Sequence, residues 1–252
     1  MSELYQNIMD EPSELIKSLR YNTGEGRAAL SDAAELVRNA DHVFITGIGS
    51  SWHAGMAIEG LFNASARPVH LVDASELLHF VEFPENAVVI MLSRSGKSVE
   101  IVELLARTQS KGTPVIAVTN TPDSPLGKSA DVVLFLNAAF DKNVSITMYS
   151  ALTLVGGLLA ADSLGQLDDA LLEGITEALT ESEAQLQTWK EALDGNAFFE
   201  QQVPVYFLAR GSSLATCHEA RLLWEEAVKF PASAMMTGCF RHGPQEILNE
   251  NV

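Results

Sequence analysis

Residues 42–63, HVFITGIGSSWHAGMAIEGLFN, decide the fold. The stretch opens with a β-branched and aromatic run, breaks at Gly47 and Gly49, and continues as a helical pattern. Such a run, ending in glycine and serine before a helix, is typical of a buried strand, a tight loop and a helix. The stretch therefore predicts one strand–loop–helix unit of an α/β sheet.

Four more short apolar runs follow, and helical stretches such as SVEIVELLARTQSKG (98–112) separate them. The runs are VHLVDA (69–74), AVVIML (87–92), PVIAVTN (114–120) and VVLFLN (132–137). Strands that are apolar along their whole length, with helices between them, indicate a parallel sheet covered on both faces. We therefore predict a doubly wound parallel α/β domain over residues 41–161.

Residues 1–40 precede this domain and predict two helices. The first helix is expected around Leu4–Arg20 and the second over Ser31–Asn39, with Ser31 as its N-cap. A further helix from about Tyr149 to Ala161 is expected to complete the domain.

The C-terminal part repeats the strand–loop–helix device. Gly-Ser-Ser triplets begin at Gly49 and at Gly211, 162 positions apart, and each follows an apolar run. This favours an internal duplication, with a helical linker at 162–200 and a second, incomplete lobe at 201–252. Only eight residues follow the motif FRHGP (240–244). We therefore expect a fragment of a longer protein, the alternative being that a partner chain supplies the missing strands.

Composition excludes several classes of protein. The formal net charge of −17, with only 16 Lys and Arg, argues against binding to nucleic acid or an anionic membrane. The most apolar stretch, 151–161, is shorter than the about 20 residues that a membrane span needs. The two cysteines, Cys217 and Cys239, lack zinc-finger spacing and favour a reducing cytoplasm. We expect no metal and no organic cofactor.

Two loops carry the signal for an anionic ligand. Gly49-Ser50-Ser51 lies where a strand gives way to a helix, where glycine lets the backbone approach an anion and the helix N-terminus offers free N–H groups. Ser93-Arg94-Ser95-Gly96-Lys97-Ser98 combines hydroxyls, a glycine and two cations at the next such place. The structural alternatives are a tight turn for the first loop and a polar N-cap for the second. Neither loop matches a P-loop or a dinucleotide motif.

These loops, a third one at 143–147, Glu226 and the motif FRHGP resemble the sugar-isomerase (SIS) family. The resemblance spans most of the chain, implies a flavodoxin-like fold, and is nearest to the isomerase module of glucosamine-6-phosphate synthase and to related ketose/aldose isomerases, aminosugar-phosphate deaminases and fructosamine-phosphate deglycases. It implies a hexose or aminosugar phosphate as ligand and a homodimer.

The resemblance also implies roles for particular residues. Glu226 matches the proton-shuttling carboxylate, and His242 matches the ring-opening histidine, which in related enzymes reaches a neighbouring subunit's site. The residues implied to bind substrate are Gly49, Ser50, Ser51, Ser93, Arg94, Ser95, Gly96, Ser98 and Val144. A carboxylate and an imidazole suit proton transfer between C1 and C2 and opening of the hemiacetal ring. Alternatively, Glu226 lies on a solvated helix face and His242 is a surface residue.

The chain departs from the synthase pattern at three places. Ser145-Ile146-Thr147 lacks the lysine of the third loop, Arg94 replaces a glutamine, and, as the sequence opens with Met1-Ser2, we expect no glutaminase domain. We therefore expect an isomerase or an isomerising deaminase that does not use glutamine. The alternatives are a non-catalytic phosphosugar sensor, since the same fold also serves regulators, and a dimerisation module whose site has decayed.

Overall fold

The computed structural model describes residues 2–141, 144–200 and 203–248. Its centre is a parallel sheet of five strands in the order β2-β1-β3-β4-β5. In that order the strands are β2 (His70–Asp73), β1 (His42–Gly47), β3 (Ala87–Leu92), β4 (Val115–Thr119) and β5 (Val132–Phe135). All five correspond to the predicted apolar runs. The central strands β1, β3 and β4 are buried along nearly their whole length, so they cannot alternate with polar residues, whereas the edge strands β2 and β5 are only partly buried.

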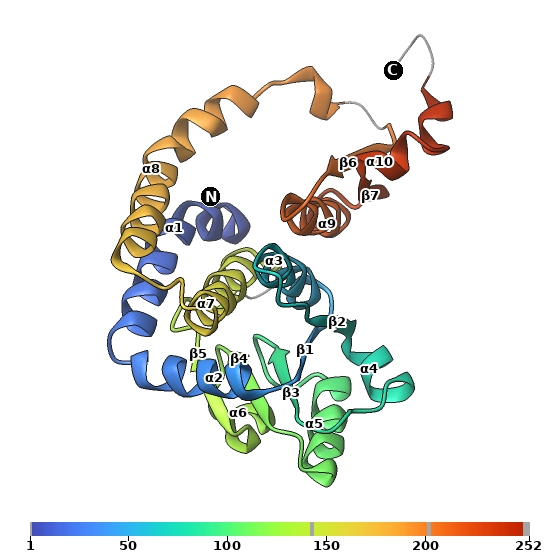
Figure 1. Cartoon of the computed structure of the whole chain (residues 1–252). Coiled ribbons are helices and arrows are strands. Elements are labelled where there is room, and N and C mark those ends of the chain that lie inside the picture. The colour runs from blue at the N-terminus through green and yellow to red at the C-terminus, as the bar shows by residue number, and fades with distance from the viewer. Residues whose placement is uncertain (1, 142–143, 201–202, 249–252) are drawn as a thin grey trace.

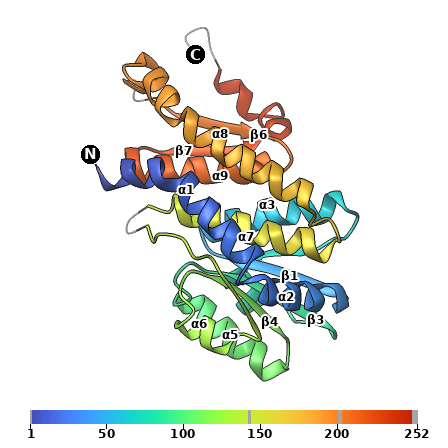
Figure 2. The same cartoon turned by 90° about the vertical axis from the view of Figure 1, so that its left-hand side faces the viewer.

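Helices cover both faces of this sheet, as Figure 2 shows. One face packs on α1 (Glu3–Thr23), α2 (Arg27–Asn39), α3 (Ser50–Ala64) and α7 (Thr147–Ser163). The other packs on α4 (Ala74–Phe80), α5 (Val99–Lys111) and α6 (Pro125–Ser129). Side chains alternate between the two cores: Val88 and Ile90 belong to the first, and Val89 and Met91 to the second. The predicted doubly wound fold is confirmed.

The strand order places a ligand crevice between β1 and β3. Both β2 and β3 pair with β1, so the chain runs outward in opposite directions from the β1–β3 pair. At such a switch point, the loops that follow the two strands diverge at their carboxyl ends and leave room for a ligand. These loops are the two that the sequence singled out, after Gly47 and after Leu92.

The predicted N-cap at Ser31 is wrong. Helix α2 begins four residues earlier, at Arg27, with Gly26 at its N-cap position. The Ser31 hydroxyl instead accepts a hydrogen bond from Arg27 Nη1 at 2.7 Å, within the helix. Arg27 also lies 2.5 Å from the carboxylate of Asp162 at the end of α7. Helix α2 begins directly after a tight turn in which the Gly26 and Arg27 N–H groups donate to the carbonyl oxygens of Tyr21 and Gly24.

The residues that follow α7 arch over the helices α1, α3 and α7 on one side of the sheet (Figure 1). Helix α8 (Asp169–Leu193) runs beside α1, and α3 lies between the sheet and α9 (Ser213–Leu223). The other elements are η1 (Ala197–Glu200), β6 (Val205–Ala209), η2 (Trp224–Val228), β7 (Ala232–Met236), α10 (Thr237–Phe240) and η3 (Pro244–Ile247).

β6 and β7 form a two-stranded parallel sheet with α9 packed on both strands. Gly211 has the same φ of +58° as Gly49, so the two Gly-Ser-Ser triplets share a local geometry. Two strands do not define a second doubly wound sheet, and the predicted second lobe and the domain boundaries remain predictions.

Among the described residues, none of the helices combines the length and the hydropathy needed to cross a bilayer.

Candidate functional site

The loop after β1 presents backbone N–H groups at the crevice. Gly49 precedes α3 with a φ of +58°, a conformation that glycine adopts without strain, and it provides no side chain to cap the helix. A Cβ atom at Gly47 would lie 2.8 Å from the carbonyl carbon of Ser51, so the turn also needs glycine there. Ser50 and Ser51 follow as the first two residues of α3. There, their hydroxyls, the N–H groups of the first turn and the helix dipole favour an anion.

The loop after β3 is held by hydrogen bonds within the loop and from the neighbouring loop after β4. The Gly96 N–H donates to Ser93 Oγ at 3.1 Å within the loop. From the neighbouring β4 loop, the Asn120 N–H and the Thr121 hydroxyl donate to the carbonyl oxygen of Arg94, each at 3.1 Å. Ser98 then lies at the N-cap of α5, where its side chain makes no capping hydrogen bond. These hydrogen bonds hold the backbone of the loop in place, and the hydroxyl of Ser98 and the N-terminus of α5 are available to a phosphate.

The guanidinium group of Arg94 is positioned by the segment that follows β5. It lies 5.3 Å from the ring centroid of Phe140, a cation–π distance, and its Nη1 donates to the carbonyl oxygen of Asp141 at 3.4 Å. A planar cation fixed in this way suits a phosphate that the serine hydroxyls also contact.

Asp141 anchors the third loop. Its carboxylate accepts hydrogen bonds from the N–H groups of Ile146 at 3.0 Å, Thr147 at 3.4 Å and Met148 at 2.8 Å. Burial raises the pKa of Asp141, and these hydrogen bonds lower it in part. The carboxylate thereby fixes Ser145 and the first turn of α7.

Replacing Asp141 with alanine should lower the free energy of unfolding by about 2–3 kcal/mol, because buried N–H groups lose a charged acceptor. Urea denaturation measures this effect, with the exposed Asp123→Ala as the matched control. Equal stability of the two variants would show that the carboxylate does not anchor the loop.

Glu226 reaches the crevice from the turn that follows α9. Helix α9 continues into η2, a single π-helical turn that contains Glu226 and ends at Val228, and the next residue, Lys229, has a φ of +62°. Such π turns occur frequently at functional sites because they change which side chains face inward. Leu222 and Glu226 both line the crevice.

The three loops and this turn enclose one cavity of about 330 Å³. Its lining residues are Ile48, Gly49, Ser50, Ser51, Ser93, Arg94, Ser95, Ser98, Ser145, Leu222 and Glu226. The structure thus brings together eight of the predicted residues. Of the others, Gly96 shapes the second loop without lining the cavity, and the half-buried Val144 lies beside Ser145, which lines it instead. Sequence reasoning gave no role to Ile48 or Leu222 and missed Ser145 as the lining residue of its loop.

His242 does not join this cavity. It is exposed in the turn after α10, where its backbone N–H donates to the carbonyl oxygen of Cys239 at 3.1 Å. Its role stays a prediction that depends on a second subunit.

The charge of Glu226 depends on its surroundings in the cavity. Burial raises the pKa of Glu226 above its ordinary value of 4.5, and the charge of Glu219 raises it further. The charges of Arg94 and Lys229 act in the opposite direction and lower it. A carboxylate with a raised pKa next to a cation is suited to accept and return a proton.

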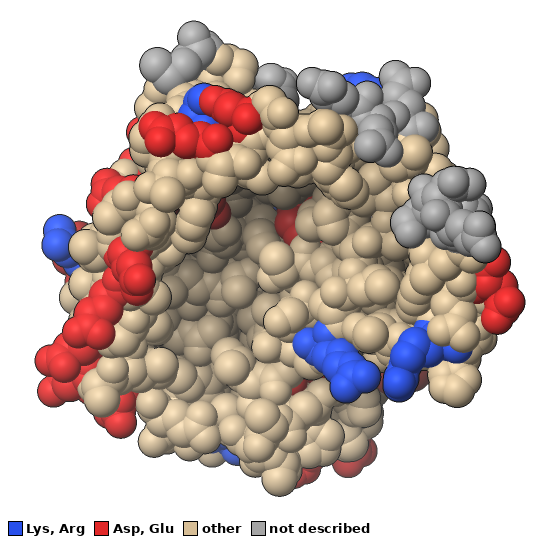
Figure 3. Space-filling model, turned by 90° about the horizontal axis from the view of Figure 1, so that it is seen from above, with Lys and Arg blue, Asp and Glu red and all other residues tan. Residues whose placement is uncertain are grey.

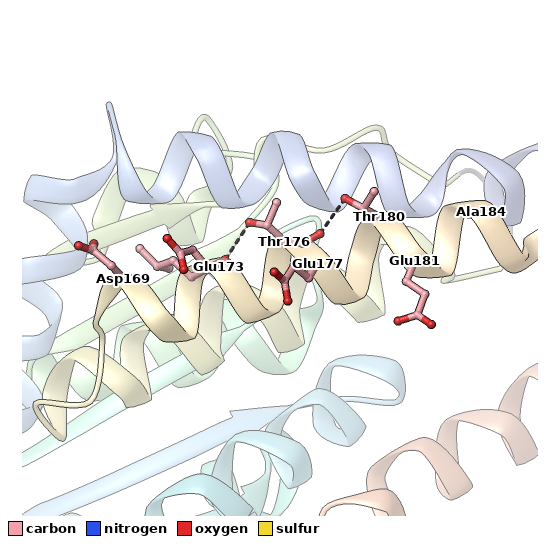
Figure 4. Close-up of a pocket in the computed structure, with 8 residues that line it drawn as sticks. Asp169, Glu173, Thr176, Glu177, Thr180, Glu181 and Ala184 are labelled. Carbon is pink, nitrogen blue, oxygen red and sulfur yellow. Dashed lines mark hydrogen bonds between the residues drawn. The ribbon is translucent and has the colours of Figure 1, made fainter.

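A larger cavity, of about 750 Å³, lies along α8, and Figure 4 shows its lining residues. These include Asp169, Glu173, Glu177 and Glu181, which recur every four residues along that single helix. Figure 3 shows acidic side chains along the rim of a broad hollow on this side of the molecule. Groups from one helix do not converge on a ligand, so the smaller polar cavity is the candidate site.

Among the described residues, no group of three or more His, Cys, Asp or Glu side chains is arranged to hold a metal ion.

An open α/β sheet whose switch-point loops offer serines and an arginine, in one cavity with a carboxylate from η2, defines a class of small-molecule-binding proteins. The family model of the SIS domain matches residues 36–161, and the chain belongs to this family.

Its relatives include the glutamine–fructose-6-phosphate aminotransferase (isomerizing) of Thermococcus kodakarensis. The two sequences are 25% identical over an alignment of 267 positions, which covers 99% of this chain and 42% of that protein. The chain therefore spans about two fifths of the length of this relative.

Solved structures share the fold. The C-terminal domain of glucosamine-fructose-6-phosphate aminotransferase from Francisella tularensis superposes with a TM-score of 0.86 at 21% identity, covering 99% of this chain and 74% of that one. Glucosamine-6-phosphate deaminase from Thermotoga maritima gives a TM-score of 0.80 at 19% identity, covering 98% of this chain and 74% of that one.

Proposed function

We propose that the chain binds a hexose phosphate or aminosugar phosphate and catalyses aldose/ketose isomerisation or isomerising deamination. The observation that carries this proposal is the cavity that Glu226 lines together with Arg94 and the serines of the switch-point loops. The phosphate lies against Ser93, Ser95 and Ser98, with its charge balanced by Arg94.

The chemistry follows from this arrangement. With the phosphate fixed at the loops, C1 and C2 of the open-chain sugar lie toward η2, within reach of the Glu226 carboxylate. The carboxylate removes a proton from one carbon and returns it to the neighbouring carbon, and the hydroxyls of Ser50 and Ser51 bind the sugar oxygens. His242 of a second subunit opens the sugar ring in a homodimer. Membership of the family and the names of the relatives support the class of substrate.

The proposal is tested by proton NMR in D₂O with fructose 6-phosphate, glucosamine 6-phosphate and galactosamine 6-phosphate, each added separately. Loss of the C1 or C2 proton signal in one of them is the expected result and identifies the sugar. Unphosphorylated fructose is the control and should not exchange. Binding without exchange for all three would indicate the sensor function instead.

The pH dependence of turnover should reflect Glu226. Because the carboxylate is the active form and burial raises its pKa, kcat/KM should fall as the pH decreases, with an apparent pKa above 4.5. In Arg94→Gln the acid limb should move to higher pH, because Arg94 lowers this pKa in the wild type. Pre-steady-state or initial-rate profiles between pH 4.5 and 8 measure both. An acid limb that moves to lower pH in this variant would contradict the assignment.

A further inference from the structure

A buried pair of titratable side chains joins α3, which follows the loop after β1, to α9, which leads into the turn that carries Glu226. Nδ1 of His53 in α3 lies 2.7 Å from Oε2 of Glu219 in α9, and the two side chains are 4% and 2% exposed. An ionised carboxylate only accepts hydrogen bonds, so Nδ1 is the donor. The other oxygen of Glu219 is also buried and has no hydrogen-bond partner in the part of the chain that the structure describes. The hydrogen bond from His53 therefore offsets the burial of this carboxylate.

Contacts on either side of this pair define an antiparallel register between α3 and α9. At the start of α9, Ser212 Cβ lies 3.7 Å from the position that a Cβ atom of Gly60 would take. At its end, Leu222 Cδ2 lies 4.0 Å from the position that a Cβ atom of Gly49 would take. Residue numbers thus rise along α9 as they fall along α3. The turn that follows α9 therefore extends past the N-terminus of α3, where Glu226 lines the sugar cavity with the loops after β1 and β3.

The covalent connection to α9 does not set this register. The chain that leads from α8 toward β6 is exposed at residues 191–199. Within α9, the buried residues are Ala215, Cys217 and Glu219, of which Glu219 alone has an ionisable carboxyl group. Sliding α9 by one turn, about 5.4 Å, would leave this carboxylate buried without its donor, whereas a small apolar side chain tolerates a new neighbour. The hydrogen-bonded pair thus favours one register over its neighbours.

We propose that His53 and Glu219 are positioning residues for the proton transfer, because their hydrogen bond sets the register of α9 on α3 and so places the Glu226 carboxylate in the sugar cavity. Glu226 lies seven residues beyond Glu219, about 10 Å along a helix, so neither member of the pair has to touch the sugar carbons. A displacement of about 1 Å at a reacting group can lower a rate roughly 10²-fold. This inference rests on the proposed function, since the position of Glu226 is measured through proton exchange.

The double variant His53→Leu/Glu219→Leu separates positioning from stability. Replacing a buried ion pair with apolar side chains often leaves a protein as stable as before, or more stable. The midpoint of urea denaturation should therefore stay at or above the wild-type value. The affinity for fructose 6-phosphate, measured by isothermal titration calorimetry, should change by less than about threefold, because the residues proposed to contact the phosphate lie in other elements. The rate of C1–C2 proton exchange in D₂O should fall roughly 10²-fold.

Two conservative variants restore the hydrogen bond by other groups. In Glu219→Gln the amide oxygen accepts from His53 without a charge, and in His53→Asn the amide nitrogen donates from the position of Nδ1. Each should keep at least about a third of the wild-type exchange. Rates are compared at the alkaline plateau of each variant, so that changes in the pKa of Glu226 do not enter. Arg221→Gln breaks an ion pair that stays within α9 and its π turn, at 2.8 Å from Glu225, and should exchange as the wild type does.

The outcomes separate the inference from the proposed function. Wild-type exchange in the stable double variant would overturn the inference and leave the proposed function intact. An equal loss of exchange in Glu219→Gln and in the double variant would also overturn it, since the hydrogen bond survives in the first. A double variant that loses stability, affinity and exchange together would show a structural role only. A wild type that exchanges none of the three sugars would refute the proposed function, and the inference with it.

Discussion

Replacing Glu226 with glutamine should lower the rate of C1–C2 proton exchange by roughly 10²–10⁴-fold, the usual contribution of a general base. Glutamine keeps the size and polarity of the side chain but cannot accept the proton. The residues proposed to contact the phosphate lie in other loops, so the affinity for the phosphosugar should change by less than about threefold. Exchange in D₂O and isothermal titration calorimetry measure the two quantities separately.

Glu225→Gln is the matched control for this variant. Glu225 is the neighbouring residue in η2, but its carboxylate pairs with Arg221 at 2.8 Å and does not line the sugar cavity. It should retain exchange near the wild-type rate. Equal losses in the two variants would mean that the effect comes from the turn as a whole and not from the Glu226 carboxylate.

Replacing Gly96 with alanine should lower the free energy of unfolding by about 2–4 kcal/mol and abolish measurable phosphosugar binding. Gly96 has a φ of +60°, and an added Cβ would lie 2.1 Å from Ser124 Oγ and 2.8 Å from Ser124 Cβ. Relief of this clash requires the loop to move away from the β4 loop, which displaces Ser95 and Ser98. Urea denaturation and calorimetry with fructose 6-phosphate report the two effects.

Gly112→Ala separates backbone strain from the clash. Gly112 ends α5 with a similar φ of +67°, but no atom lies within 4 Å of an added Cβ. This variant should lose about 1 kcal/mol and keep its ligand. If Gly96→Ala bound the phosphosugar as tightly as Gly112→Ala does, the second loop would not hold the phosphate.

The sheet could be predicted because each buried strand is a continuous apolar run between glycine or serine loops. The meeting of the two loops that we propose as the phosphate site could be predicted for a related reason. Parallel strands end at one edge of the sheet, so the polar residues after Gly47 and after Leu92 had to meet there. The family match then confirmed the domain type over residues 36–161.

Other features depended on contacts that are distant in sequence. Helix α2 begins after Gly26 and not at a capping serine, and its first residue, Arg27, contacts Asp162, 135 residues away. Ser145, in place of Val144, lines the cavity because the carboxylate of Asp141 sets the path of its loop. The π turn that presents Glu226 leaves no periodic signal in a short helix, so the sequence identified this residue through the family motif alone.

The most direct test of the account is a crystal structure of Glu226→Gln with fructose 6-phosphate. The account predicts the phosphate against Ser93, Ser95, Ser98 and Arg94, with C1 and C2 of the open-chain sugar within about 3.5 Å of the residue 226 side chain, as proton transfer requires. A phosphate bound outside these loops, or a sugar whose C1 and C2 point away from residue 226, would contradict it.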